Sequence, residues 1–274
     1  MIGMFDSGFG GLTVMRHVVR ALPDYDYLYL GDNARVPYGS RSEWIIYEFA
    51  RQAVDYLFNQ GCQLIVVACN TASATALRRI QQEYLPNTFP ERRVLGVIRP
   101  SVEVLIRETK SRKVGILATE AVVRSGSYIK EIEKLDSSIQ VFQQACPLLV
   151  PIIEAGEQNW EGTEMIVARY LGELFTREKE IDSLLLACTH YPILSDIFRR
   201  HAPKTSVILE QGQIVAVKLK DYLIRHPEID AKISRNGSRS FLTTDTSDKF
   251  DRLTKIFYGE PVQSHLVPLE SLGI

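Results

Sequence analysis

The chain is poor in cysteine and carries almost no net charge. Only four of its 274 residues are cysteines, and none of them are spaced as Cys-x-x-Cys. A structural zinc site and a disulfide framework are therefore not expected, because both need clustered or regularly paired cysteines. The formal net charge is −1 at pH 7, so the composition points to neither nucleic acid nor an anionic membrane as a partner.

Long hydrophobic runs are missing as well. The longest apolar runs, near positions 64–69 and 184–188, are too short to span a bilayer. Met1 to Asp6 contain neither a basic leader nor a long apolar stretch, so we expect no signal peptide and a cytoplasmic protein. With 45% hydrophobic and 24% charged residues, the composition is typical of a soluble protein that buries a substantial core.

Short apolar segments alternate with longer segments that have helical spacing, such as 12–22, 42–60 and 72–83. Continuously apolar strands separated by helices are typical of parallel sheets covered on both faces. The sequence therefore predicts an α/β fold throughout. The predicted strands are 2–5, 27–30, 64–68, 94–97, 113–117, 139–142, 183–186, 206–209 and 240–244.

One segment of the chain occurs twice. Positions 65–71 read IVVACNT and positions 184–190 read LLLACTH, each an apolar strand followed by Ala-Cys and two polar residues. A weaker echo pairs positions 2–7 with 114–119. We expect two similar parallel-sheet α/β domains related by pseudo-symmetry, with a boundary near Pro100 and the site at their interface. The pattern alone does not assign the region after 206 to either domain.

Polar residues gather where the predicted strands end. Ligands of parallel α/β sheets bind beyond these carboxyl ends. Helices predicted to begin beside both cysteines would attract carboxylates and lower a thiol pKa, although capping and core packing explain single residues equally well. The residues at these ends are Asp6, Ser7, Asp32, Pro37, Tyr38, Gly39, Cys69, Asn70, Thr71, Thr119, Cys188, Thr189 and His190.

Two cysteines at facing strand ends suggest a particular reaction. Inverting a carbon centre needs a base on one face and an acid on the other. If the domains face each other, the Cys69 thiolate could remove the α-proton while the Cys188 thiol returns one from behind. Asp6 is placed to serve Cys69, and either His190 or Glu154 could serve Cys188. This chemistry requires no cofactor and no metal.

The motifs around these residues resemble those of glutamate racemases, in the aspartate/glutamate racemase family. The first block is FDSGFGG at 5–11. The others follow in the family's order over nearly the whole chain: GDNARVPYG at 31–39, ACNTAS at 68–73, CPLLVP at 146–151, ACTHYP at 187–192 and LTTD at 242–245.

The resemblance implies a cofactor-independent glutamate racemase that supplies D-glutamate for peptidoglycan and commonly forms a homodimer. It implies that Cys69 acts on the D-enantiomer and Cys188 on the L-enantiomer. It places residues 1–98 plus 207–274 in the first domain and 99–206 in the second. It predicts that substrate is bound by Asp6, Ser7, Tyr38, Gly39, Asn70, Thr71, Thr189 and His190. To these the strand-end positions add Pro37 and Thr119 as substrate-binding residues, and Asp32 and Glu154 are expected to support them.

Three positions depart from the family's pattern. Val122 stands where a second substrate-binding threonine is usual, and Arg99 stands where an acidic residue is common. Glu210 begins an EQG stretch that replaces an Asp-Ser-Gly-like one. The hydroxyl that is missing at position 122 bears on substrate affinity and on specificity for the substrate side chain.

Other functions stay open on the sequence. An aspartate racemase would use the same cysteines. A dinucleotide-binding oxidoreductase is suggested by Gly8 and Gly10 after a strand and by Asp32 after the next, but Thr13 occupies the place of the third glycine. Some relatives also bind DNA gyrase, a side role that the sequence neither supports nor opposes.

Overall fold

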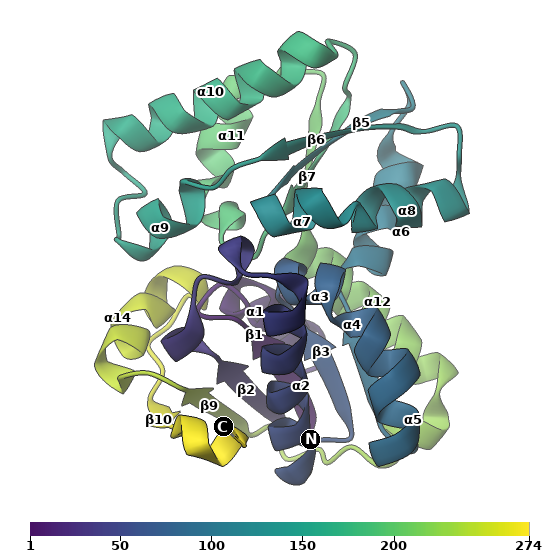
Figure 1. The fold of residues 1–274 in the computed structure, drawn as a ribbon, viewed down its shortest axis with the longest axis vertical. Helices are drawn as coiled ribbons and strands as arrows, with labels where there is room; N and C mark the ends of the chain where they lie inside the picture. Colours follow the sequence, from purple (N-terminus) through teal and green to yellow (C-terminus); the bar gives the residue numbers. More distant parts are fainter. Residues whose placement is uncertain (274) are drawn as a thin grey trace.

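Two parallel sheets, one in each of two α/β domains, form the computed structural model, which describes residues 1–273 apart from the side chains of 247–249 (Figure 1). The six-stranded sheet has the order β10-β9-β2-β1-β3-β4, with β1 Ile2–Asp6, β2 Tyr27–Gly31, β3 Leu64–Val67, β4 Arg93–Gly96, β9 Arg239–Thr243 and β10 Ser264–Leu266. The four-stranded sheet has the order β6-β5-β7-β8, with β5 Lys113–Ala118, β6 Gln140–Ala145, β7 Ser183–Ala187 and β8 Val207–Glu210.

The strand order confirms the duplication predicted from the two Ala-Cys motifs. The four consecutive strands β2-β1-β3-β4 of the first sheet match β6-β5-β7-β8 of the second, position by position along the chain. Cys69 follows the third strand of one set and Cys188 the third strand of the other. The pseudo-symmetry therefore gives the two cysteines equivalent places in their domains.

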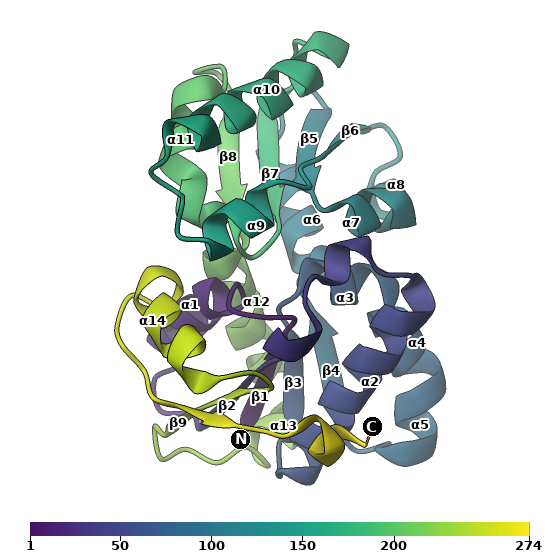
Figure 2. The ribbon, with the colours of Figure 1, turned by 60° about the vertical axis from the view of Figure 1, so that its left-hand side comes forward.

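Helices cover both faces of each sheet, as the continuously apolar strands predicted. Alternate residues of a strand point to opposite faces, so Leu64 and Val66 of β3 lie in one core cluster while Ile65 and Val67 lie in another. Figure 2 shows α1 and α14 on one side of the first sheet and α2 to α4 on the other. The helices are α1 Leu12–Ala21, α2 Glu43–Asn59, α3 Asn70–Thr75, α4 Leu77–Arg79, α5 Leu85–Thr88, α7 Glu120–Ser125, α8 Ser127–Leu135, α9 Leu149–Glu154, α10 Glu161–Arg177, α11 Ser195–His201, α13 Pro227–Asp230 and α14 Ser247–Phe257.

Two further helices carry the chain from one domain to the other. Helix α6 (Ile98–Glu108) follows β4 and packs on α8, whereas α12 (Gln211–Arg225) follows β8 and packs on α1. Pro100, the expected boundary, lies in the first turn of α6, where the missing N–H of proline costs nothing. The expected return at 207 is corrected, because Val207–Glu210 pair with β7 and so belong to the second sheet.

The structure also corrects two expected helices. The predicted helix 72–83 is a broken run of α3, α4, the π-helical turn Ile80–Tyr84 and α5. After Cys188 the backbone forms a 3₁₀ turn, Tyr191–Leu194, and an α-helix begins only at Ser195. Strand β10 was not predicted because its three residues are too few for a pattern. Within residues 1–273 no helix is long and apolar enough to cross a membrane.

Candidate active site

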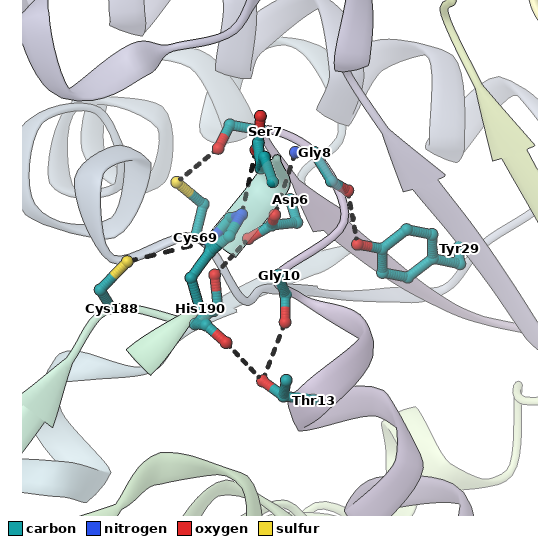
Figure 3. Close-up of polar contacts among 11 residues, drawn as sticks. Asp6, Ser7, Gly8, Gly10, Thr13, Tyr29, Cys69, Cys188 and His190 are labelled. Atoms are coloured by element: carbon teal, nitrogen blue, oxygen red, sulfur yellow. Dashed lines mark hydrogen bonds and ion pairs between the residues drawn. The ribbon is translucent and has the colours of Figure 1, made fainter. Parts of the chain in front are cut away.

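The loop after β1 meets the loop after β7 in close contact between the domains (Figure 3). A Cβ atom on Gly10 would lie 2.2 Å from Thr189 Oγ1 and 2.5 Å from His190 Nδ1, so only glycine fits there. The Thr13 hydroxyl lies 2.8 Å from the carbonyl oxygens of both Gly10 and Thr189. Thr13 stands where a dinucleotide-binding fingerprint would have its third glycine, and its hydroxyl links the two domains through these contacts.

Cys69 is the N-cap of α3 and lies almost fully buried in the first domain. Its thiol donates to Ser7 Oγ at 3.4 Å, and its sulfur accepts from the Ala72 N–H at 3.5 Å. Burial, reinforced by the charge of Asp6, raises the pKa of Cys69 to about 12 despite these two contacts. The expected lowering of this thiol pKa by the helix start is wrong, because the desolvation of the buried thiol outweighs the effect of the helix start.

Asp6 connects the neighbourhoods of the two cysteines. Its carboxylate accepts from the Gly8 N–H at 3.0 Å and from Thr189 Oγ1, across the domain interface, at 3.3 Å. Burial raises the pKa of Asp6, while the charge of His190 and the bonds from Gly8 and Thr189 oppose that rise. Asp6 therefore acts on Cys69 through its charge, while Ser7 supplies the hydrogen bond.

Asp6→Asn should stabilise the fold at neutral pH. A raised folded-state pKa means that the stability associated with neutral Asp6 is present at low pH and is lost as the pH rises through the folded pKa. Asparagine removes this loss, so the melting temperature should rise by roughly 3 °C at pH 7.5 and differ little at pH 4. Thermal unfolding at both pH values measures this. Asp24→Asn, on an exposed side chain, is the matched control, and an Asp6→Asn protein less stable at pH 7.5 would contradict the prediction.

The hydrogen-bond partner of Cys188 is a titratable side chain, whereas that of Cys69 is the Ser7 hydroxyl. His190 Nδ1 lies 3.9 Å from Cys188 Sγ, and its Nε2 lies 3.0 Å from Glu154 Oε1, which comes from the end of α9. Burial lowers the pKa of His190, but the bonds to Cys188 and Glu154 outweigh it and raise that pKa to about 10. The arrangement can hold a charged imidazolium between a sulfur and a carboxylate.

Tyr38, predicted to bind substrate, is oriented by residues on other elements. It follows Pro37, which precedes the turn Tyr38–Ser40. The Tyr38 hydroxyl donates a short hydrogen bond to Asp32, which also accepts from Arg35 Nε at 2.6 Å and from Thr244 Oγ1 at 2.9 Å. Asp32 therefore orients Tyr38, and Arg35 and Thr244, which lie in two of the family-like blocks but were not predicted as site residues, hold Asp32 in place.

Two predicted threonines meet across the domain interface. Thr71 Oγ1 lies 3.0 Å from Thr119 Oγ1, and a Cβ on Gly39 would lie 3.2 Å from Thr119 Cβ. Asn70, by contrast, directs its side-chain amide away from this group, toward Gln211 and Tyr128. Gln211 stood out in the sequence only as part of the EQG departure, and Tyr128 carried no signal, because both are distant from position 70 along the chain.

The three departures from the family's pattern lie in different surroundings. Val122 is fully buried in the core cluster between the second sheet, α6 and α8. Arg99 is exposed and paired with Glu103 and Glu131. Glu210, at the end of β8, accepts from Ser195 and Arg199.

No group of three or more His, Cys, Asp or Glu side chains that could hold a metal ion occurs in the described part of the chain. The residues that meet at the interface are two thiols, two carboxylates (Asp6 and Glu154), an imidazole and several hydroxyls. Such a set can move protons on both faces of a small polar substrate.

Comparisons with known proteins fit this arrangement. The model of the Asp/Glu/Hydantoin racemase family matches residues 2–218. The chain belongs to this racemase family. The glutamate racemase of Persephonella marina is 38% identical over 269 residues, covering 98% of this chain and 96% of that protein. The glutamate racemase of Aquifex aeolicus is 37% identical, covering 96% and 95% of the two chains.

Solved racemases share the two-domain architecture. A glutamate racemase isoform from Bacillus anthracis superposes with a TM-score of 0.89 at 31% identity, covering 98% of this chain and 97% of its own. The Francisella tularensis glutamate racemase, solved with D-glutamate, gives 0.87 at 31% identity, covering 98% of both chains. The predicted fold class, two parallel-sheet α/β domains, is confirmed.

Proposed function

We propose that this racemase interconverts L- and D-glutamate without a cofactor, using Cys69 and Cys188 as paired base and acid. The observation that carries the proposal is the meeting of the two Ala-Cys strand ends. Ser7 bonds the Cys69 thiol, the adjacent Asp6 bonds Thr189, and Thr189 adjoins Cys188. Relatives named glutamate racemase, similar over nearly the full chain, support the choice of substrate.

The reaction begins with D-glutamate between the two thiols. The Cys69 thiolate takes the α-proton, the electron pair remains on Cα as a carbanion, and the Cys188 thiol donates its proton to the opposite face. The products are L-glutamate, a Cys69 thiol and a Cys188 thiolate, so atoms and charges balance. The reverse reaction exchanges the two roles.

The neighbours of each thiol suit these roles. The Asp6 carboxylate would attract the substrate's α-ammonium, whose positive charge in turn favours the Cys69 thiolate over its thiol. His190 would stabilise the Cys188 thiolate left after proton donation, with Glu154 holding the imidazole in place. Tyr38, Gly39, Thr71, Thr119 and Thr189 are proposed to bind the substrate's polar groups, since they surround the same interface.

Substrate choice is tested directly in deuterated water. The purified protein should convert D-glutamate to L-glutamate without added cofactor and incorporate deuterium at Cα. Aspartate, shorter by one methylene, should turn over at least about tenfold less efficiently. Chiral chromatography and mass spectrometry measure both. Deuterium incorporation into aspartate alone would make the protein an aspartate racemase.

We further propose a cytoplasmic homodimer that supplies D-glutamate for peptidoglycan. The four cysteines are all unpaired thiols, the state that a reducing compartment maintains. Leu148, Trp160 and Met165 expose large apolar surfaces near α9 and α10, which suits a contact between subunits. Light scattering should give twice the monomer mass, and a monomer mass at micromolar concentration would contradict the dimer.

A further inference from the structure

Four buried polar side chains form a network beside Cys69 that the catalytic proposal does not use. Gln211 and Asn70 lie side chain to side chain, with Asn70 Nδ2 donating to Gln211 Oε1. Gln211 Nε2 lies 2.9 Å from both Ser101 Oγ and Tyr128 OH, and 3.1 Å from Asn70 Oδ1. The Tyr128 hydroxyl donates to Asn70 Oδ1 at 2.6 Å.

The donors and acceptors of this network match. The side-chain amide of Gln211 has two N–H groups, and the hydroxyl oxygens of Ser101 and Tyr128 can each accept a hydrogen bond from one of them. Each hydroxyl donates its own proton to a different acceptor: Ser101 donates to the Val97 carbonyl oxygen at 2.6 Å, and Tyr128 donates to Asn70 Oδ1. A buried network whose members are all satisfied holds a single geometry, because an unpaired buried polar group is costly.

The four residues come from four different helices: the two that connect the domains, one helix of the second domain, and the helix that begins beside Cys69. Gln211 begins α12 and Ser101 lies in α6, the two helices that carry the chain between the domains. Tyr128 comes from α8 of the second domain. Asn70 is the first residue of α3 and directly follows Cys69, the N-cap of that helix.

We propose that Gln211 is a positioning residue for the reaction. It fixes the Asn70 side chain and, through it, the turn that presents the Cys69 thiol to the facing domain. Position 211 is where the family resemblance implies a serine, whose hydroxyl sits on Cβ and falls short of Asn70. The hydrogen bond from Asn70 Nδ2 to the side-chain oxygen of residue 211 is therefore a property of glutamine at this position.

The inference rests on the proposed racemase activity, and kinetics provide its first test. Gln211→Leu keeps the volume of the side chain but removes every bond. We expect kcat to fall about tenfold and KM to change less than threefold, because a thiol displaced from its attack position slows the chemical step. Gln213→Leu, on an exposed glutamine of the same helix, should leave both constants unchanged.

A double-mutant cycle separates positioning from general support of the fold. If Gln211 acts through Asn70, Asn70→Ala combined with Gln211→Leu should be no slower than Asn70→Ala alone. Multiplicative effects would overturn the proposal, as would a rise in KM at unchanged kcat, or a lower melting temperature without a kinetic change. Should Gln211→Leu fail to fold, Tyr128→Phe keeps the ring packing and should lower kcat in the same direction by a smaller factor.

A readout independent of turnover separates failure of this inference from failure of the racemase assignment. The rate of Cys69 alkylation by iodoacetamide, followed by mass spectrometry, should change at least threefold in Gln211→Leu. Cys62, buried outside the interface, is the internal reference and should keep its rate. An unchanged Cys69 rate would overturn the positioning role even if glutamate proves not to be the substrate.

Discussion

Cys188→Ala should lower racemisation of glutamate by about a thousandfold or more, yet it should still exchange the α-proton of D-glutamate with solvent. Alanine removes the acid on one face, while the Cys69 thiolate remains able to take the proton and return it from the same side. Incubation with D-glutamate in deuterated water, followed by NMR and chiral analysis, measures exchange and inversion separately. Cys69→Ala should show the mirror result, with exchange of L-glutamate only.

Isotope exchange is needed because steady-state kinetics cannot assign the two roles. The enantiomers have equal free energies in water, so kcat/KM must be equal in both directions for every variant. Cys62→Ala is the matched control, since this buried thiol packs against Gly3 and Ile65, away from the interface, and should leave inversion unchanged. Exchange of L-glutamate by Cys188→Ala would reverse the assignment, and full inversion by the double alanine variant would end the two-thiol mechanism.

His190→Gln should lower kcat about a hundredfold, because Cys188 loses the cation that stabilises its thiolate. Glutamine can still bond to Glu154 but cannot carry a charge at any working pH. Coupled assays at pH 7.5 with the wild-type protein as reference measure this effect. His201→Gln is the control, since His201 lies at the end of α11 and pairs with Glu164. Retention of more than a third of wild-type kcat would contradict the proposed role.

The same residue predicts a stability profile. The pKa of His190 rises from 6.5 to about 10 on folding, despite burial, through its bonds to Cys188 and Glu154. The stabilisation is therefore fully present below pH 6.5 and is lost as the pH rises toward 10. Urea unfolding at pH 6.5 and pH 10 should show a smaller decrease in the free energy of unfolding for His190→Gln than for the wild type. Equal decreases would contradict the pKa shift.

Local patterns were sufficient for the architecture. The central strands β1, β2, β3, β5 and β7 are buried on both faces, so their apolar runs are visible in the sequence without reference to any partner strand. The repeat of Ala-Cys after two such runs predicted the duplicated strand order, and the strand-end rule selected Asp6, Cys69, Cys188 and His190 before any contact was known. Strand β10 was missed, since three residues carry no period.

Properties that depend on burial were not visible in the sequence. A cysteine at a helix start suggested a lowered pKa, yet burial and the charge of Asp6 raise the pKa of Cys69 to about 12. The backbone after Cys188 was also not visible, since a 3₁₀ turn, Tyr191–Leu194, stands there and the α-helix begins only at Ser195.

The sequence by itself determined which residues can do chemistry and that they occur in two equivalent places, because side-chain type and strand periodicity are local properties. Only the tertiary structure decided which of these residues meet. It paired His190 with Glu154, placed Asp32 and Thr244 behind Tyr38, and turned Asn70 toward Gln211. Contacts between residues distant in the chain depend on how two domains pack, and no spacing along one strand or helix encodes that.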